Sequence, residues 1–147
     1  MPTAARLVAA LSLALLAFVV SGMVIPLLPD GRGVGDWFAP VNMAIGLVTG
    51  WVVMGPRAGR GTVPGINNGL TAMVAMMFWE LFVHATDEMV RLAMRNRYDG
   101  PFEAIVGILY IGQDYAIMIM TTEIIVTLLV GGVAAGLATE YASRRWR

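Results

Sequence analysis

Glu80 and His84 are the residues of this chain whose types and spacing are best suited to chemistry. They lie four positions apart in an apolar segment, so on a helix they share one face, one turn apart. Asp87 and Glu88 continue that face. Such a stripe of carboxylate and imidazole groups could bind a metal ion or relay protons. Ionisable residues within a membrane span are functional candidates by default.

The same stripe also has an interpretation that needs no function. His84 ends the apolar segment, and there a histidine and a glutamate can extend toward the membrane surface. A lone Glu-x-x-x-His pair is a weak metal signal, and the chain has one histidine and no cysteine. We therefore predict no metal site and keep both residues as candidate polar groups within the membrane. Beyond them, Asp87–Arg97 is expected to continue as an amphipathic surface helix, with Asp87 and Arg91 forming a favourable pair.

Asp114 lies well inside the segment Phe102–Met120, with Gln113 beside it. Glu103, Tyr110 and Asp114 follow one another at steps of seven and four, which places them on one helical face. If the segment crosses the membrane, this polar stripe lines a cavity or a contact between subunits, because a charge facing lipid is costly. If the segment lies on the membrane surface, the stripe faces water. The sequence leaves both interpretations open.

Other polar and soft side chains have more ordinary explanations. Asn67 and Asn68 open the segment Ile66–Val83, where they either hydrogen-bond across helices or, as we favour, cap and orient the helix. The Arg57–Arg60 loop could attract an oxyanion or a lipid phosphate, but basic loops between spans are routine. The 11 methionines lack a regular array with a flanking histidine, so we assign them to apolar packing rather than to a soft metal.

No pattern in the chain is typical of an enzyme. It has no nucleotide-binding loop and no Ser–His–Asp set, and one histidine cannot supply two haem ligands within one copy. The absence of cysteine excludes disulfides and thiolate chemistry by this chain. No basic surface of the kind that binds nucleic acid is present. We therefore predict a protein that is not an enzyme and that takes no cofactor and no nucleic acid.

These residues are set in a chain dominated by apolar stretches. Of 147 residues, 58% are hydrophobic and 14% charged, against about 25% charged in soluble domains. About 20 apolar residues suffice to cross a bilayer as a helix, and the runs lack the alternation of a membrane β-barrel. The sequence therefore predicts an all-α fold: one polytopic transmembrane helical bundle over residues 1–147, with four or five spans. The five segments are Leu7–Leu28, Trp37–Met54, Ile66–Val83, Phe102–Met120 and Ile124–Tyr141.

Glycines indicate where these helices pack. Gly46 and Gly50 in the second segment are four residues apart, as are Gly132 and Gly136 in the fifth. This spacing lets membrane helices approach closely. We therefore predict that these four positions are helix-packing contacts.

The ends of the segments carry their own signals. The first segment is too long for a signal peptide and should end as a retained span near Pro26–Pro29, because proline breaks helices. A turn is predicted over Pro29–Asp36. Trp37 and Phe38 then come where an aromatic belt at the membrane surface would place them. Thr122 is a plausible N-cap for the last helix.

Cytoplasmic loops are enriched in arginine, but counting arginines gives nearly equal support to two topologies. With five spans and the N-terminus outside, seven of ten face the cytoplasm: Arg32, Arg91, Arg95, Arg97, Arg144, Arg145 and Arg147. With four spans and both ends inside, six do: Arg6, Arg57, Arg60 and the three at the C-terminus. We predict five spans, because the short connection Thr121–Glu123 should set the fourth and fifth segments side by side and antiparallel.

Several short segments spread over the whole chain resemble one family. They are MPTAARLVAA at the N-terminus, Phe38–Asn42 (FAPVN), Met54–Gly61 (MGPRAGRG), Ile66–Leu70 (INNGL), Tyr98–Pro101 (YDGP), Leu129–Gly136 (LVGGVAAG) and the closing SRRWR. Together they resemble the TrgA family of bacterial membrane proteins, which takes its name from tellurium resistance. The resemblance implies a role in tellurite resistance and carries no catalytic or binding residue with it.

These observations lead to one expected function and one alternative. We expect a small multi-pass protein of the bacterial inner membrane that contributes to tellurite resistance, by oxyanion transport or by supporting another membrane complex. The alternative is a structural or accessory subunit of an energy-transducing membrane complex. In either case the expected partners are the lipid bilayer and a second copy of the chain or another membrane protein, because five helices enclose little space.

Overall fold

The structure is a computed structural model that describes residues 3–28 and 36–146. The turn predicted over Pro29–Asp36, apart from Asp36 itself, lies outside these residues, as do Arg32 and Arg147. Five helices are long and apolar enough to cross a membrane. They are α1 (Thr3–Val24), α2 (Phe38–Thr49), α3 (Thr62–Met94), α4 (Pro101–Ile119) and α5 (Thr122–Arg145). The predicted all-α helical bundle is thereby confirmed, and no strand occurs in the described ranges.

Three short elements of other helical types join or extend these helices: η1 (Ile25–Leu27), η2 (Gly50–Met54) and η3 (Gly55–Arg57). As predicted, α1 ends next to Pro26, at Val24, because proline lacks the amide hydrogen that the helix needs. The N-cap of α5 is Thr121 and not Thr122. The Thr121 Oγ1 atom accepts a hydrogen bond from the amide of Ile124 at 3.4 Å.

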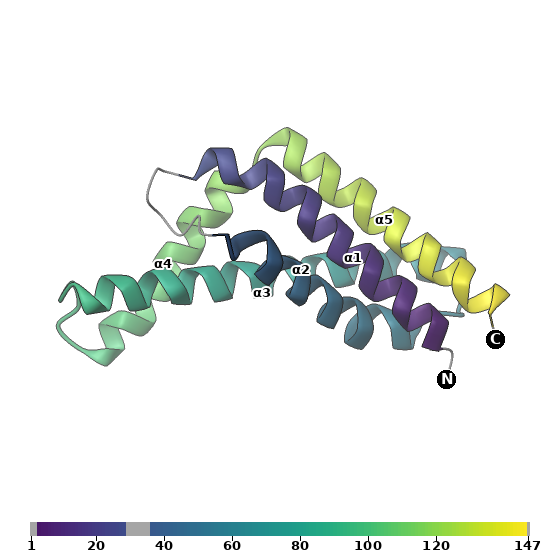
Figure 1. Ribbon diagram of the computed structural model, residues 1–147, viewed down its shortest axis with the longest axis horizontal. Coiled ribbons are helices and arrows are strands. Elements are labelled where there is room, and N and C mark those ends of the chain that lie inside the picture. The colour runs from purple at the N-terminus through teal and green to yellow at the C-terminus, as the bar shows by residue number, and fades with distance from the viewer. Residues whose placement is uncertain (1–2, 29–35, 147) are drawn as a thin grey trace.

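Four helices form the body of the molecule (Figure 1). Helix α1 lies between α2 and α5, and α5 also packs along α3. The first turn of α1 and the last turn of α5 lie at the same end of this body. Because successive members of this group run in opposite directions, the connection between α2 and α3 lies at that end too.

Helix α4 does not join this group in the predicted way. The expectation that the fourth and fifth segments pack side by side is wrong, because α4 crosses α3 and does not run along α5 (Figure 1). Gly112 of α4 faces Ala85 of α3, where a Cβ atom on the glycine would lie 3.7 Å from the alanine Cβ. None of the residues of α4 is buried. A three-residue connection therefore permits a sharp change of direction between two helices, and it does not force them together.

Helix α3 is longer than its apolar segment. It has 33 residues and begins at Thr62, because Pro64 is tolerated in a first turn, where amide hydrogens have no helical partner. Asn67 and Asn68 therefore lie in the second turn and do not open the helix. At its other end α3 runs without a break to Met94, so most of the surface segment predicted over Asp87–Arg97 is helical.

Gly46 of α2 and Gly50 of η2 lie against the backbone of α1. A Cβ atom on Gly46 would lie 2.7 Å from the carbonyl oxygen of Leu13. One on Gly50 would overlap the carbonyl oxygen of Ala9 and lie 2.6 Å from the Cα of Ala10. Only a residue without a side chain fits such a distance, so each glycine sets how closely the two helices approach.

Gly132 and Gly136 of α5 face α3 where it carries Gly65 and Gly69. A Cβ atom on Gly136 would overlap the carbonyl oxygen of Gly65 and lie 3.0 Å from the Cα of Gly69. On Gly132 it would lie 3.2 Å from the Cβ of Met73. We call Gly65, Gly69, Gly132 and Gly136 the α3–α5 glycine contact. Sequence reasoning identified only its α5 half.

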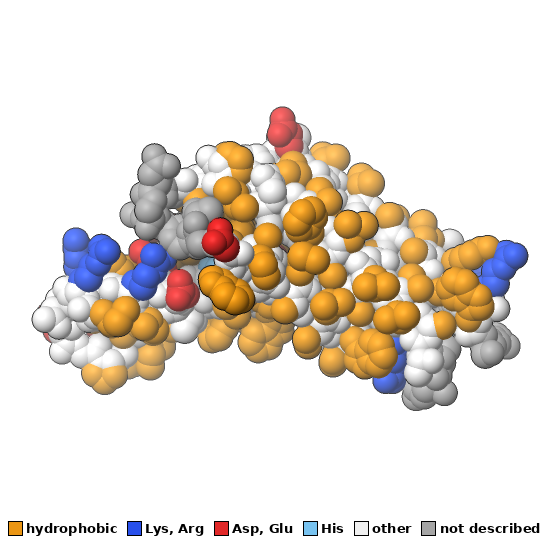
Figure 2. All heavy atoms as spheres, viewed as in Figure 1, with side chains coloured by type: hydrophobic (Ala, Val, Ile, Leu, Met, Phe, Trp, Pro, Cys, Tyr) orange, Lys and Arg blue, Asp and Glu red, His pale blue; other side chains and the backbone are white. Residues whose placement is uncertain are grey.

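The outer surface of the bundle is apolar. Large exposed hydrophobic side chains occur on all five long helices, among them Leu15, Val48, Val74, Leu109 and Val130. Figure 2 shows hydrophobic side chains spread over the middle of the molecule, with arginines toward its two ends. A soluble monomer rarely exposes so wide an apolar surface to water, whereas lipid tails can cover such a surface.

Candidate functional site

A cavity of about 60 Å³ lies between the last turns of α1, the first turns of α2 and the second half of α3. One water molecule needs about 10–15 Å³ of such space, so the cavity has room for a few. Side chains near the end of α4, including those of Tyr115, Met118 and Ile119, close it on one side. Its polar lining comes from Ser21, Asn42, Glu80, His84, Asp87, Arg91 and Tyr115.

A chain of hydrogen bonds among residues that line this cavity joins three helices. The Nε2 atom of His84 on α3 lies 2.7 Å from the Oδ1 atom of Asn42 on α2. The Nδ2 atom of Asn42 donates to the hydroxyl oxygen of Ser21 on α1 at 2.9 Å. The hydroxyl of Ser21 donates in turn to the carbonyl oxygen of Ala17 at 2.7 Å. Ser21 and Asn42 are both buried, and buried polar groups need such partners.

The direction of these bonds determines the state of His84. Because Asn42 presents its amide oxygen, the Nε2 atom of His84 must carry a hydrogen and donate it. The other ring nitrogen, Nδ1, is then the one that can take up a proton. The ring is held in place by Phe38, which stacks on it with ring centroids 4.4 Å apart. Phe38 is buried and packs within the bundle, whereas Trp37 is exposed.

Glu80 lies one turn from His84 on the same wall of the cavity. Only 6% of the residue is exposed. Its Oε1 atom is buried and has no hydrogen-bond partner among the described residues. A buried, unpaired carboxylate charge is costly, so burial favours either the protonated, neutral form of Glu80 or a bound cation beside it.

Charged residues gather on α3 at the open end of the cavity. The guanidinium of Arg91 lies 2.8 Å from the carboxylate of Glu88 and 3.6 Å from that of Asp87. The pair predicted between Asp87 and Arg91 is therefore present, with Glu88 as an additional partner. Asp87 is exposed, so this end of the cavity meets the surface.

Asp114 and its neighbours are not part of this cavity. Asp114, Gln113 and Tyr110 are exposed on α4, so within one chain the stripe lines nothing. Glu103 instead accepts a hydrogen bond from the backbone amide of Asp99 at 2.9 Å, which holds the turn before α4. The polar side chain that α4 does bring to the cavity is Tyr115, which the sequence analysis did not select.

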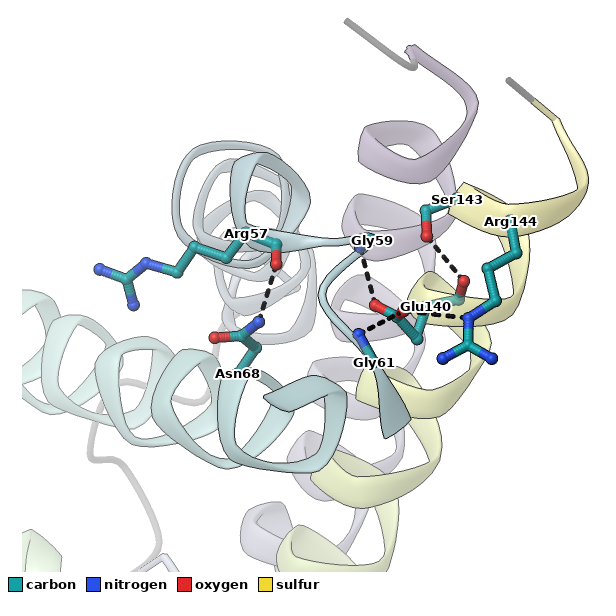
Figure 3. Close-up of polar contacts among 7 residues, drawn as sticks. All are labelled: Arg57, Gly59, Gly61, Asn68, Glu140, Ser143 and Arg144. Carbon is teal, nitrogen blue, oxygen red and sulfur yellow. Dashed lines mark hydrogen bonds and ion pairs between the residues drawn. The ribbon is translucent and has the colours of Figure 1, made fainter. Parts of the chain in front are cut away.

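A second polar cluster lies at the opposite end of the bundle, where Glu140 of α5 holds the loop before α3 (Figure 3). Its two carboxylate oxygens accept hydrogen bonds from the backbone amides of Gly59 at 2.7 Å and Gly61 at 2.8 Å. Arg144 lies 3.2 Å from the same carboxylate. Both glycines have positive φ angles, +90° and +121°, which other residues adopt only with strain.

This cluster answers two expectations about the loop. The backbone amides of Gly59 and Gly61 in this loop are bound to Glu140, while Arg57 and Arg60 are exposed. Asn68 donates from its Nδ2 atom to the carbonyl oxygen of Arg57 at 3.0 Å, so it fastens the end of η3 to α3. Asn67 is exposed.

Neither a metal centre nor a known relative assigns a chemistry to these clusters. Among the described residues, no three His, Cys, Asp or Glu side chains come together as a metal site would require. The chain matches no protein-family model, no curated protein and no solved structure. The chemistry of the cavity therefore follows from its own residues: a buried acid, an oriented imidazole and space for water.

Proposed function

We propose that this chain is a multi-pass protein of the bacterial inner membrane that contributes to tellurite resistance without catalysing a reaction. The apolar outer surface of five membrane-length helices supports the membrane assignment. The resemblance to the TrgA family, distributed from the N-terminus to the closing SRRWR, supports the role in resistance. The observation that carries a function within the membrane is the cavity with Glu80 and His84 on one wall.

We propose four spans, with both ends in the cytoplasm and α4 outside the group. The beginning of α1, the connection between α2 and α3 and the end of α5 lie at one end of the bundle. That end therefore carries Arg6, Arg57, Arg60, Arg144 and Arg145. An excess of arginine marks the cytoplasmic side.

Single cysteines test this topology directly, because the natural chain contains none. Thr3→Cys, Thr62→Cys and Trp146→Cys should react with a membrane-impermeant maleimide only in inverted vesicles. Arg97→Cys should react in intact spheroplasts. Labelling of Thr3 and Trp146 from opposite sides would contradict four spans and support five.

The charge of the cavity bears on how the chain would act against tellurite. Glu80 and Asp87 are acids, and the only arginine in its described lining, Arg91, is already paired with Asp87 and Glu88. Burying an unpaired anion in this space is costly, because no unshared positive charge lines it. We therefore favour support of another membrane complex, or a path formed between copies, over transport of the oxyanion through one chain.

Growth in tellurite tests the proposed role. Cells that lack the gene should be more sensitive than wild type, and the wild-type gene should restore tolerance. Glu80→Gln and His84→Ala should fail to restore it while still present in the membrane, because both alter the cavity. Asp114→Asn should restore it, since Asp114 is outside the cavity. Unchanged tolerance in the deletion strain would refute the role in resistance.

The alternative function, an accessory subunit of an energy-transducing complex, is supported by α4. A helix with no buried residue and with Gln113 and Asp114 exposed has two faces available to a partner. In this case the chain should co-purify with another membrane protein in mild detergent. Asp114→Leu should then reduce the yield of the partner, while Glu80→Gln should leave it unchanged.

A further inference from the structure

Two glutamates are buried in the described part of the chain, and their surroundings differ. Glu140 is 4% exposed, and its carboxylate accepts two backbone hydrogen bonds and an ion pair. Glu80 is 6% exposed, yet its Oε1 atom has no hydrogen-bond partner among the described residues. The hydrogen bonds to Glu140 therefore stabilise its ionised form, whereas no described hydrogen bond stabilises a negative charge on Oε1 of Glu80.

From this contrast and the cavity, we infer that Glu80 is a proton-exchanging carboxyl group, which binds and releases a proton within the bundle. The cavity has room for a few water molecules and reaches from Glu80 past His84 to Asp87 and Arg91. This inference does not depend on the tellurite phenotype, because it concerns the protonation of one side chain.

The groups that line the cavity together with Glu80 are consistent with proton exchange. Helix α1 contributes Ser21 and α2 contributes Asn42, neither of which titrates. Helix α4 contributes Tyr115, and α3 itself contributes His84, Asp87 and Arg91. The one positive charge, on Arg91, is shared with Asp87 and Glu88 at the open end. No described side chain of the lining therefore supplies Glu80 with an unshared positive charge.

The exchange requires no other reactant than water. A proton arriving from water at the end marked by Asp87 forms an O–H bond on the carboxylate of Glu80, and the same bond breaks when the proton returns. His84 can hold a proton in between, because its Nε2 atom is engaged with Asn42 and its Nδ1 atom is the remaining basic site. No electron moves, and no group is transferred.

Labelling with dicyclohexylcarbodiimide tests the inference on the full-length protein in liposomes. This apolar reagent adds to protonated carboxyl groups within a membrane, and peptide mass spectrometry locates the adduct. We expect an adduct on Glu80 whose yield falls as the pH rises, since only the protonated acid reacts. Glu80→Gln should lose the adduct. Glu140, the matched buried acid, should stay unlabelled across the same pH range.

Three outcomes would overturn the inference: no adduct on Glu80, a yield that does not change with pH, or equal labelling of Glu140. Protection of Glu80 by added sodium chloride at constant pH, with choline chloride as the control salt, would also overturn it and indicate a cation site. Because the adduct is located in the wild-type chain, the result does not require that Glu80→Gln folds. Tellurite is absent throughout, so failure here is distinct from failure of the proposed role in resistance.

Discussion

Replacing Gly136 by leucine should unfold most of the bundle at temperatures where the wild type is stable. Even the first atom of the new side chain would overlap the carbonyl oxygen of Gly65 and lie 3.0 Å from the Cα of Gly69. Backbone atoms cannot move aside as a flexible side chain does, so α3 and α5 must separate. Overpacking typically costs about 1–3 kcal/mol, and we expect about 3 kcal/mol or more here. Unfolding in detergent mixtures with rising sodium dodecyl sulfate, followed by circular dichroism, measures this loss.

Gly22 provides the matched control for that experiment. It also lies within a long helix, but a Cβ atom there would meet nothing within 4 Å. Gly22→Ala should therefore be neutral or stabilise the protein by about 0.5–1 kcal/mol, because glycine weakens a helix relative to alanine. If Gly136→Leu unfolds at the same detergent fraction as wild type, α3 and α5 do not approach as closely as the α3–α5 glycine contact requires.

Replacing Glu140 by alanine should release the loop between η3 and α3. The change removes the acceptor for the amides of Gly59 and Gly61 and leaves them without a protein partner. Hydrogen bonds to charged groups contribute about 1.5–3 kcal/mol each. Since the loop is partly exposed and water can replace some of this, we expect a loss of about 2–3 kcal/mol in total. The pair with Arg144, whose own side chain is exposed, should add little.

Limited digestion with trypsin shows whether this loss is local. Trypsin cuts after arginine; Arg57 precedes the anchored loop, and Arg60 lies within it, between Gly59 and Gly61. In Glu140→Ala, cleavage there should increase relative to cleavage after Arg97 at the other end of the bundle. Ser143→Ala serves as the control, because its hydroxyl donates only to the backbone oxygen of Glu140. Equal cleavage in both variants would mean that Glu140 does not hold the loop.

The helices were predictable because each rests on a continuous apolar run, which is a local signal. The same holds for the end of α1 beside Pro26. Residues that contact one another across the bundle were harder to predict from the sequence. Gly132 and Gly136 show a packing spacing, but Gly65 precedes the expected start of α3 at Ile66, so of its two partners on α3 only Gly69 fell within the predicted helix. Only the structure shows that the helix begins four residues earlier, at Thr62.

The site was predictable where its residues share one helix and not where it crosses helices. Glu80 and His84 stand out in the sequence because ionisable residues are rare in apolar runs. Ser21 and Asn42 give no such signal, because small polar residues are common in spans and their contacts join separate helices. Glu140 binds backbone amides 79 and 81 positions away, on glycines that have no side chain to indicate a partner.

The length of α3 bears on which side of the membrane could supply protons to Glu80. Its 33 residues span about 50 Å at about 1.5 Å per residue, while the hydrocarbon layer is about 30 Å thick. A tilt of about 40° would still leave it about 38 Å tall, so the charged turns around Asp87 and Arg91 can stand in water. Toward the other end, glycine contacts bring the backbones of α1 and α2 and of α3 and α5 together, and the residues that line the cavity do not extend there. The cavity would then open on one side of the membrane only. Glu80 would respond to the pH of that single compartment, and protons would not cross the membrane through this chain.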